Sequence, residues 1–222
     1  MEEEGVVLLG FWSSPYVTRV KIALEEKGIQ FLYKEEENIF LGKSPLLLEA
    51  NPIYKKVPVL IHNGKPICES LNILEYIDQV WKDKFPILPH HPYERARSRF
   101  WIDFFDKMIY DIGRRMWASK GEDQEEAKQE FLKSLKLLEE ELGDKPYFGG
   151  DQFGLLDIAL IPFSCRFYTY ETFCKFNLEK ICPKLMKWVN KCNERESVSK
   201  ALPNPYKVYD FVLEVKKMLG IE

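Results

Sequence analysis

A short apolar run, followed at once by a serine, a proline and a helical pattern, dominates the start of this chain. Val6 to Phe11 predicts a buried strand, and Trp12-Ser13-Ser14-Pro15-Tyr16 separates it from helix-patterned positions. Proline is favoured at the first position of a helix, because its missing N–H would have no partner there. Ser14 is therefore predicted to be the N-cap, where unpaired N–H groups and the helix dipole stabilise an anion. Taken alone, the same pattern is also satisfied by a serine that only caps its helix.

Residues 1–83 alternate strand patterns with helical ones. The predicted elements are a strand at 6–11, a helix at 15–27, a strand at 29–33, a short helix from 44, strands at 57–61 and 65–68, and a helix from 70. Asn63-Gly64 separates the last two strands and is a strong hairpin signal. The order β-α-β-α-β-β-α is that of a thioredoxin-like domain.

Pro58 stands at the start of a predicted central strand, where a proline removes a donor from the ladder. A cis Val57–Pro58 bond would resolve this conflict and turn the backbone of Val57 toward an open site. Thioredoxin-like domains carry a cis-proline at this point in their order. We therefore expect a cis bond, although only about 5–6% of X–Pro bonds in folded proteins are cis.

No strand pattern appears in the rest of the chain. Pro86 and Pro89 mark a linker over residues 84–91, and residues 92–222 read as helical. Three apolar stripes at helical spacing are expected, at positions 104/105/108/109/112, 131/135/138/142 and 208/211/215/219. The charged stretch 120–141 is interpreted as the solvated face of the second of these helices. The predicted fold is an α/β thioredoxin-like domain (1–83) followed by an all-α domain (92–222).

Composition describes an ordinary globular protein: 45% of the 222 residues are hydrophobic, 30% are charged, and the net charge is −3. This charge gives no general attraction to nucleic acid or acidic membranes. No apolar run approaches the roughly 18 residues of a membrane span, and the acidic N-terminus does not resemble a secretory signal. Five scattered cysteines without a C-x-x-C pair favour a reducing compartment, and we expect the cytoplasm. The three histidines show no metal-ligand spacing, so no metal is expected.

Several motifs, taken together with their spacing along the chain, resemble those of the cytosolic glutathione transferases, most closely their plant tau class. They are Trp12-Ser13-Ser14-Pro15, the segments 51–60 (NPIYKKVPVL) and 62–71 (HNGKPICESL), and later 139–142 (EEEL), 145–150 (KPYFGG) and Asp157-Ile158-Ala159. The similarity runs nearly from end to end of the chain.

The resemblance assigns roles to matching positions, with glutathione as co-substrate and no further cofactor. Ser14 matches the serine that holds the glutathione sulfur, and Ser13 is one residue too early. The other glutathione-binding positions are Glu69 and Ser70 for the γ-glutamyl end, Val57 for the cysteinyl backbone, and Lys43 and Lys56 for the glycine carboxylate.

The chemistry of glutathione agrees with these assignments. Two carboxylates, an amine and a thiol require two basic contacts, one acidic contact and a stabiliser of the thiolate. Ser70 at a helix start offers N–H groups to a carboxylate, Glu69 can pair with the amine, and backbone beside Val57 can form strand-like hydrogen bonds. Each residue also has an ordinary structural interpretation, as a helix cap or a solvated lysine, so the assignment depends on their coincidence at one family's site.

By resemblance, a second site for an apolar electrophile lies between the domains and is lined by aromatic residues. Its expected residues are Phe11, Tyr110, Arg114, Trp117, Phe211 and Val215, with ordinary core packing as the alternative for Phe211. Relatives of the tau class often carry tryptophan where this chain has Arg166. We hypothesise that Arg166 favours acidic or oxygenated aromatic substrates over flat neutral ones.

Free cysteine thiols have a pKa near 8.5, and each unit of lowering requires about 1.4 kcal/mol. One charge-assisted hydrogen bond from Ser14 contributes roughly 1.5–3 kcal/mol, and the helix terminus adds about 0.3–1 kcal/mol. Together these lower a thiol pKa by roughly one to two units. Ser14 is thus expected to be the catalytic residue, as a donor to the thiolate.

The expected function is conjugation of glutathione to xenobiotic or reactive lipid electrophiles, and the resemblance extends to reduction of organic hydroperoxides. Thiol transferases and dehydroascorbate reductases of the same fold carry cysteine at the activating position, which Ser14 argues against. A non-catalytic carrier of apolar or anionic metabolites remains the alternative. The resemblance also implies a homodimer, through the helix around residues 94–101 and a face of the first domain.

Overall fold

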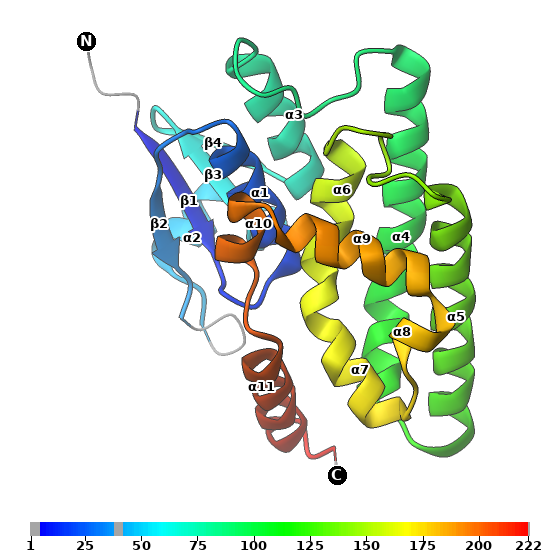
Figure 1. Cartoon of the computed structure of the whole chain (residues 1–222). Helices are drawn as coiled ribbons and strands as arrows, with labels where there is room; N and C mark the ends of the chain where they lie inside the picture. Colours follow the sequence, from blue (N-terminus) through cyan, green and yellow to red (C-terminus); the bar gives the residue numbers. More distant parts are fainter. Residues whose placement is uncertain (1–4, 38–41, 222) are drawn as a thin grey trace. The chain divides into compact units, whose positions relative to one another are not determined.

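The computed structural model describes residues 5–37 and 42–221, except for the side chain of Tyr110. The chain forms two compact units, residues 1–88 and 89–222, and each is described by itself. The first is an α/β unit and the second is helical, which confirms the predicted fold class (Figure 1).

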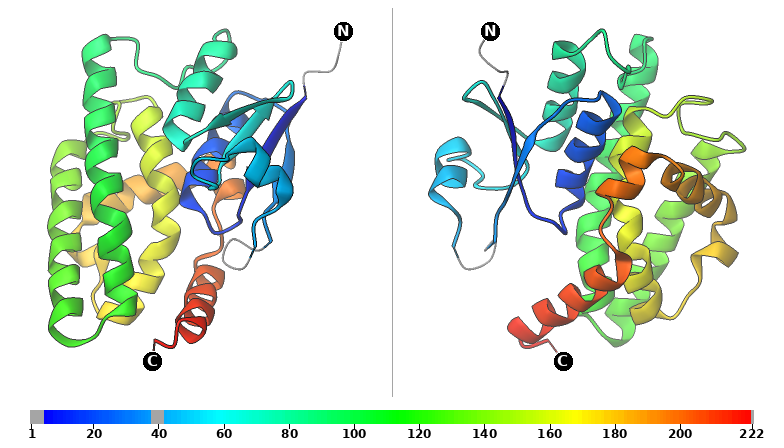
Figure 2. Two further views of the ribbon diagram at one scale, coloured as in Figure 1. Left: turned by 180° about the vertical axis from the view of Figure 1, so that it is seen from behind. Right: turned by 60° about the vertical axis from the view of Figure 1, so that its left-hand side comes forward.

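The first unit is built on a four-stranded mixed sheet in the order β2-β1-β3-β4. Strand β1 is parallel to β2 and antiparallel to β3, and β3 is antiparallel to β4. Helices α1 and α3 cover one face of the sheet and α2 covers the other (Figure 2). The elements are β1 (Val6–Gly10), α1 (Pro15–Glu26), β2 (Leu32–Glu35), α2 (Pro45–Ala50), β3 (Val59–His62), β4 (Lys65–Cys68) and α3 (Ser70–Val80).

Alternation along β1 and β3 explains this layering. Successive side chains in a strand point to opposite faces, and Leu9 and Val59 pack with Leu47 and Ala50 of α2. Leu8 lies on the opposite face and is also fully buried. The sheet therefore has two apolar layers, as a central strand without polar alternation predicts.

The predicted turns of this unit are confirmed. The Val57–Pro58 bond is cis, and Pro58 precedes the first paired residue of β3. Asn63 and Gly64 join β3 to β4 with positive φ at both residues, as a two-residue hairpin of this type requires. The second strand begins at Leu32 rather than Ile29, because Gly28 and Ile29 still close the end of α1 through hydrogen bonds to Glu25 and Leu24.

The second unit contains eight described helices and one 3-10 helix. They are α4 (Pro92–Ala118), α5 (Gly121–Leu142), α6 (Leu155–Leu160), η1 (Ile161–Arg166), α7 (Phe167–Cys174), α8 (Leu178–Ile181), α9 (Pro183–Asn193), α10 (Glu196–Ala201) and α11 (Pro205–Met218). Helices α4 and α5 lie side by side along most of their length (Figure 1). None of the helices in the described ranges is long and apolar enough to cross a membrane.

The predicted apolar stripes of this unit are buried to different extents. All four positions of the stripe on α5, from Phe131 to Leu142, are buried. On α11 the buried residues are Val208 and Val212, whereas Leu219 lies beyond the helix and is 56% exposed. The buried face of α11, which packs against α7 and η1, is therefore narrower than the expected stripe.

A buried carboxylate organises the middle of the second unit. Asp157, in the first turn of α6, accepts hydrogen bonds from the backbone N–H of Phe148 (3.0 Å), the indole Nε1–H of Trp188 (2.8 Å) and the backbone N–H of Gly154 (3.0 Å). Burial raises its pKa to about 6 against the opposing effect of these donors. One side chain thus joins the loop after α5, the start of α6 and helix α9.

Replacing Asp157 by Asn tests this arrangement through its pH dependence. The raised pKa means that the folded state binds more protons than the unfolded state between about pH 4 and pH 6. The contribution of Asp157 to stability is therefore larger at low pH and falls as pH rises through about 6. In urea unfolding, the stability difference between the native chain and Asp157→Asn should be about 1 kcal/mol larger at about pH 5 than at about pH 7.5. An equal difference at both pH values would contradict a raised pKa.

Candidate functional site

Ser14 is the N-cap of α1, as the sequence predicts. Its Oγ accepts a long hydrogen bond from the backbone N–H of Val17 (3.4 Å), and its own N–H donates to the carbonyl of Phe11 (2.9 Å). Pro15 occupies the first helical position. Within the described chain the Ser14 hydroxyl proton has no acceptor, and the side chain is half-buried. The group can therefore donate a hydrogen bond to an anion at the start of α1.

The turn that carries Ser14 is held by the end of β2. The Glu35 carboxylate accepts the backbone N–H of Trp12 (2.8 Å) and the hydroxyl of Tyr33 (2.6 Å). Burial, together with Glu35, raises the pKa of Tyr33, which therefore remains a neutral donor. At Gly10 an added Cβ would lie 2.6 Å from Val17 Cγ1 and 2.7 Å from the Tyr33 ring, so only glycine fits where these elements converge.

The strand register brings three connections that carry predicted site residues to the same end of the sheet. Leu9 near the end of β1 pairs with Val59 at the start of β3, and Val59 pairs with Cys68 at the end of β4. Ser14 follows β1, Val57 precedes β3, and Glu69 and Ser70 follow β4. The predicted glutathione-binding residues on these three connections therefore lie at the same end of the sheet.

Glu69 and Ser70 form the start of α3. Glu69 is exposed and has a positive φ of 70°, a backbone conformation that a non-glycine residue rarely adopts. The Ser70 Oγ accepts a hydrogen bond from Nη1 of Arg19 (3.2 Å), a side chain of α1 that is fully buried and lies over the Tyr16 ring. Arg19 thus fixes the helix start at which a carboxylate would bind, and this link between α1 and α3 was not predicted.

Asn51 organises the loop that leads to Val57. Its amide donates to the carbonyl of Lys56 (3.0 Å) and its oxygen accepts from the backbone N–H of Tyr54 (3.2 Å). Val57 is half-buried and lies outside the β ladder, so its backbone is available to a ligand in extended conformation. The Lys56 side chain is exposed and has no partner among the residues that the structure describes.

Lys43 lies just before α2 and donates from Nζ to the carbonyl of Lys55. The adjacent Ser44 caps α2 by accepting from Leu47 N–H (3.1 Å), and its own hydroxyl donates to the buried carboxylate of Glu36 (2.5 Å). Lys56 is the last residue of the loop 51–56, and Lys43 contacts the carbonyl of Lys55, so both predicted lysines lie at this loop. Both lysine ammonium groups can turn to a carboxylate, Lys56 directly and Lys43 by exchanging one backbone acceptor.

Cys68 lies directly before the start of α3 and is the nearest thiol in sequence to Glu69. Burial raises its pKa, and the negative charge of Glu69 raises it further. Cys68 is therefore kept as a neutral thiol, which donates weakly to the carbonyl of Ala50 (3.6 Å). It does not supply the reactive thiolate that cysteine-dependent members of the fold require.

The residues predicted to bind an electrophile are distributed over both units. Phe11 follows β1 in the first unit and is buried. In the second unit, Arg114 and Trp117 lie on the last turns of α4, Arg166 ends η1, and Phe211 and Val215 lie on α11. Tyr110 is also on α4, but its side chain lies outside the described residues.

Contacts within the second unit bring several of these elements together. Helix α11 packs against α7 and η1, and Lys216 of α11 donates from Nζ to the carbonyl of Trp117 (2.6 Å). The same ammonium lies 5.2 Å from the centre of the Phe173 ring. Phe211 is half-buried rather than fully enclosed.

Comparison with known proteins identifies the family of this site. The model of the glutathione S-transferase N-terminal domain matches residues 4–79, and that of the C-terminal domain matches residues 78–196. The chain belongs to the glutathione S-transferase family. It is 60% identical over 221 residues to the probable glutathione S-transferase parA of Nicotiana tabacum, covering 100% of both chains.

Solved structures support the same assignment and the plant tau class. Rice GST1 in complex with glutathione superposes with a TM-score of 0.93 at 44% identity, over 98% of this chain and 99% of that one. The Tau class glutathione S-transferase of mango, Mangifera indica, has a TM-score of 0.88 at 39% identity, over 93% and 96% of the two chains.

Replacing Glu35 by Ala tests how the Ser14 turn is held. Without the Glu35 carboxylate, the backbone N–H of Trp12 loses its acceptor. The amide hydrogens of residues 12–14 should then exchange with solvent several-fold faster, as measured by mass spectrometry. Lys34→Ala is the matched control, because Lys34 is an exposed neighbour in the same strand. Equal exchange in the two variants would show that the turn does not depend on Glu35.

Proposed function

We propose that this chain is a serine-type glutathione transferase that conjugates the glutathione thiolate to apolar electrophiles. The observation that carries the proposal is the Ser14 hydroxyl at the N-cap of α1, whose proton has no acceptor in the described chain. A hydroxyl that already accepts from Val17 still carries a proton that it can donate to a ligand. Donation to sulfur, together with the helix dipole, favours the thiolate over the thiol.

The remaining groups of glutathione meet complementary charges. The γ-glutamyl carboxylate would accept N–H groups at the start of α3 and the hydroxyl of Ser70, which Arg19 orients. Its amine would pair with Glu69. The cysteinyl backbone would hydrogen-bond Val57, and the glycine carboxylate would approach Lys43 and Lys56. We propose that residues 1–83 form this binding domain, with 84–91 as linker and 92–222 carrying the electrophile.

The thiolate would attack an electrophilic carbon and displace a leaving group or add to an activated double bond. The sulfur supplies the electron pair, so Ser14 acts as a hydrogen-bond donor and not as a base. We propose xenobiotics and reactive lipid products as substrates. Organic hydroperoxides are a further class: the thiolate would attack the outer oxygen and release the alcohol, and a second glutathione would convert the resulting sulfenic acid to glutathione disulfide and water. No cofactor beyond the co-substrate glutathione is needed for this chemistry.

We further propose a cytoplasmic homodimer that contacts its second copy through the helix around residues 94–101, in α4, and through a face of the first domain. Tyr93 and Phe100 lie in the first turns of α4, and each is 63% exposed. A non-catalytic carrier remains the second candidate, because the same apolar residues of α4 and α11 would also bind a ligand without reaction.

Replacing Ser14 by Ala should remove the donor and leave the fold intact, at a cost of about 1 kcal/mol for the lost cap. Conjugation to 1-chloro-2,4-dinitrobenzene at about pH 6.5 should fall roughly 10–100-fold in kcat/KM. The pH profile should shift to higher pH by roughly one to two units. Steady-state kinetics across pH measure both effects.

Ser13→Ala is the control, because Ser13 is the adjacent hydroxyl and should leave the profile in place. Unchanged kinetics in Ser14→Ala would remove Ser14 from the mechanism. A native chain that binds glutathione and conjugates none of a panel of electrophiles would favour the carrier.

Replacing Arg166 by Trp tests the origin of substrate preference. Arg166 is half-buried at the end of η1, and a cation there should favour an acidic electrophile. The ratio of kcat/KM for 4-chloro-3,5-dinitrobenzoate to that for 1-chloro-2,4-dinitrobenzene should fall roughly two- to fivefold, as expected for a partly exposed charge pair. Arg166→Lys keeps the charge and should keep the ratio, and an unchanged ratio in Arg166→Trp would contradict the hypothesis.

A further inference from the structure

Lys216 continues the buried stripe of α11. Val208 and Val212 precede it at four-residue spacing and are 0% and 4% exposed, so the three side chains share one face of the helix. Lys216 is half-buried, and burial lowers the pKa of its ammonium, as does the positive charge of Lys120. Lysine is depleted at buried positions unless it is paired, so the acceptor of this ammonium indicates its role.

The acceptor lies at the end of α4. Lys216 donates from Nζ to the backbone carbonyl of Trp117 at 2.6 Å, and no carboxylate pairs with it among the residues that the structure describes. This carbonyl is one of the last four of α4, which have no N–H partner inside their own helix. The ammonium therefore meets an unsatisfied acceptor at the negative end of the helix dipole, and such a charge-assisted bond is stronger than a neutral one.

The neighbouring carbonyl at the end of α4 is bound from two other helices. The carbonyl of Met116 accepts from Nε2 of Gln124 on α5 (2.9 Å) and from the thiol of Cys174 on α7 (3.3 Å). Lys216 supplies the donor from α11. The end of α4 is thus connected to α5, α7 and α11 by a separate side-chain donor from each.

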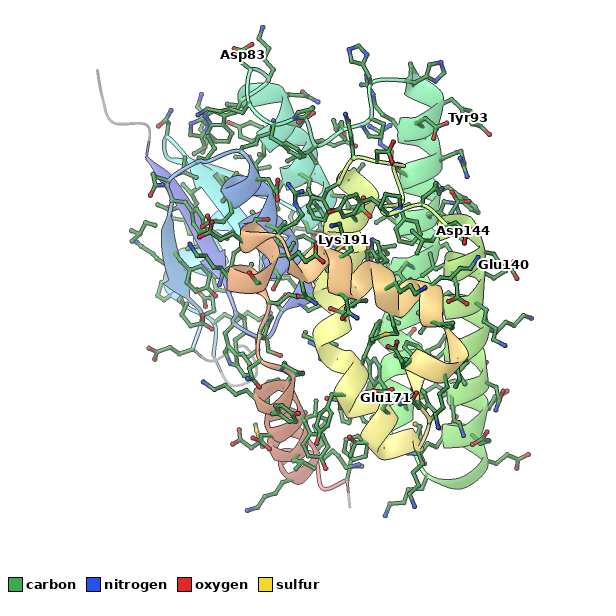
Figure 3. All side chains as sticks on the ribbon, in the orientation of Figure 1. Asp83, Tyr93, Glu140, Asp144, Glu171 and Lys191 are labelled. Atoms are coloured by element: carbon green, nitrogen blue, oxygen red, sulfur yellow. The ribbon has the colours of Figure 1, made fainter. Side chains whose placement is uncertain are left out.

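Helix α7 contacts the same ammonium through an aromatic ring. The centre of the Phe173 ring lies 5.2 Å from Lys216 Nζ, a cation–π contact, and 5.6 Å from the ring centre of Tyr209 on α11. The end of α7 is fixed by Glu171, labelled in Figure 3, whose carboxylate accepts the backbone N–H of Leu178 (2.7 Å). Lys216 therefore joins α11 to both α4 and α7.

The last turns of α11 have few other fixed points. Val208 and Val212 anchor the first part of the helix by burial. Beyond them, Leu213 and Met218 are 40% and 58% exposed. Because less apolar surface is buried at this end, the bond from Lys216 has a large share in setting its distance from α4.

We propose that Lys216 is a positioning residue for the electrophile site. Its bond holds together the last turns of α4 and α11, which carry the proposed site residues Trp117 and Val215. An apolar substituent that contacts these turns then meets elements that are already ordered, so binding costs less conformational entropy. Lys216 thereby sets the preference for bulky over small apolar electrophiles, an inference that rests on the proposed transferase function.

Replacing Lys216 by Met removes the ammonium and keeps a long unbranched side chain. The full chain is titrated by calorimetry with S-methylglutathione and S-benzylglutathione, which bind without reacting. The native chain should prefer the S-benzyl ligand. Lys216→Met should weaken that ligand roughly three- to tenfold and change the affinity for the S-methyl ligand by less than about twofold.

Two further variants separate positioning from a general loss of structure. Lys216→Arg should restore the native affinities, because a guanidinium can also donate to the Trp117 carbonyl and stack on Phe173. Lys217→Met is the matched control, since Lys217 is the exposed neighbour on the same helix, and it should leave both affinities unchanged.

Kinetics with ethyl and 2-phenylethyl isothiocyanate compare one reaction at two substrate sizes. In both, the glutathione thiolate adds to the central carbon and the nitrogen takes a proton, with no leaving group. In Lys216→Met the KM for the 2-phenylethyl compound should rise several-fold with little change in kcat, and both constants for the ethyl compound should stay near their native values.

The inference is overturned if the native chain does not prefer S-benzylglutathione, or if Lys216→Met weakens both ligands equally or neither. It is also overturned if Lys216→Arg behaves like Lys216→Met. A native chain with the expected binding preference that conjugates neither isothiocyanate would support the positioning role and contradict the proposed transferase function.

Discussion

The first backbone N–H groups of α1 have no acceptors inside their own helix. The rest of the first unit fixes the position of these groups. Strand β1 must turn within four residues to reach that helix, so the turn from Phe11 to Ser14 is short and closed by its own hydrogen bond. Glu35 holds the turn from the neighbouring strand, and Gly10 allows the strand and helix to approach. A donor stabilises a developing anion only when it is fixed beforehand, because reorienting it during the reaction costs the free energy it would supply.

Buried charges fix the rest of this unit. Lys27 pairs with Asp78 at 2.9 Å and donates to the carbonyl of Trp81, so the ends of α1 and α3 are joined. Asp78 also accepts the backbone N–H of Ile87 (2.8 Å), which ties the end of the unit to α3. Arg19 joins the same two helices nearer the site. An unpaired buried charge is strongly unfavourable, so these contacts specify one arrangement of the two helices.

Local pattern was sufficient to predict the elements that carry the proposed glutathione-binding residues. Ser14-Pro15 and Asn63-Gly64 each follow from a backbone requirement of two residues, whereas the cis bond before Pro58 followed from the order of the predicted elements. Arg19 could not be predicted in the same way, because its partner Ser70 is 51 residues away and only the packing of α1 on α3 brings them together. The second strand begins at Leu32 rather than at the predicted Ile29 for a related reason, because hydrogen bonds at the end of α1 extend to Ile29.

Residues far apart in sequence also explain what pattern missed in the second unit. The buried side of α11 depends on which helices cover it.

The thiol pKa of bound glutathione, measured from the ultraviolet absorbance of the thiolate, tests the role of Ser14 most directly. The pKa in the native complex should be roughly one to two units below that of free glutathione, and Ser14→Ala should return it close to the free value. A bound thiol with an unshifted pKa would show that the site does not stabilise the thiolate, and a lowered pKa that Ser14→Ala leaves unchanged would show that Ser14 is not the group that does.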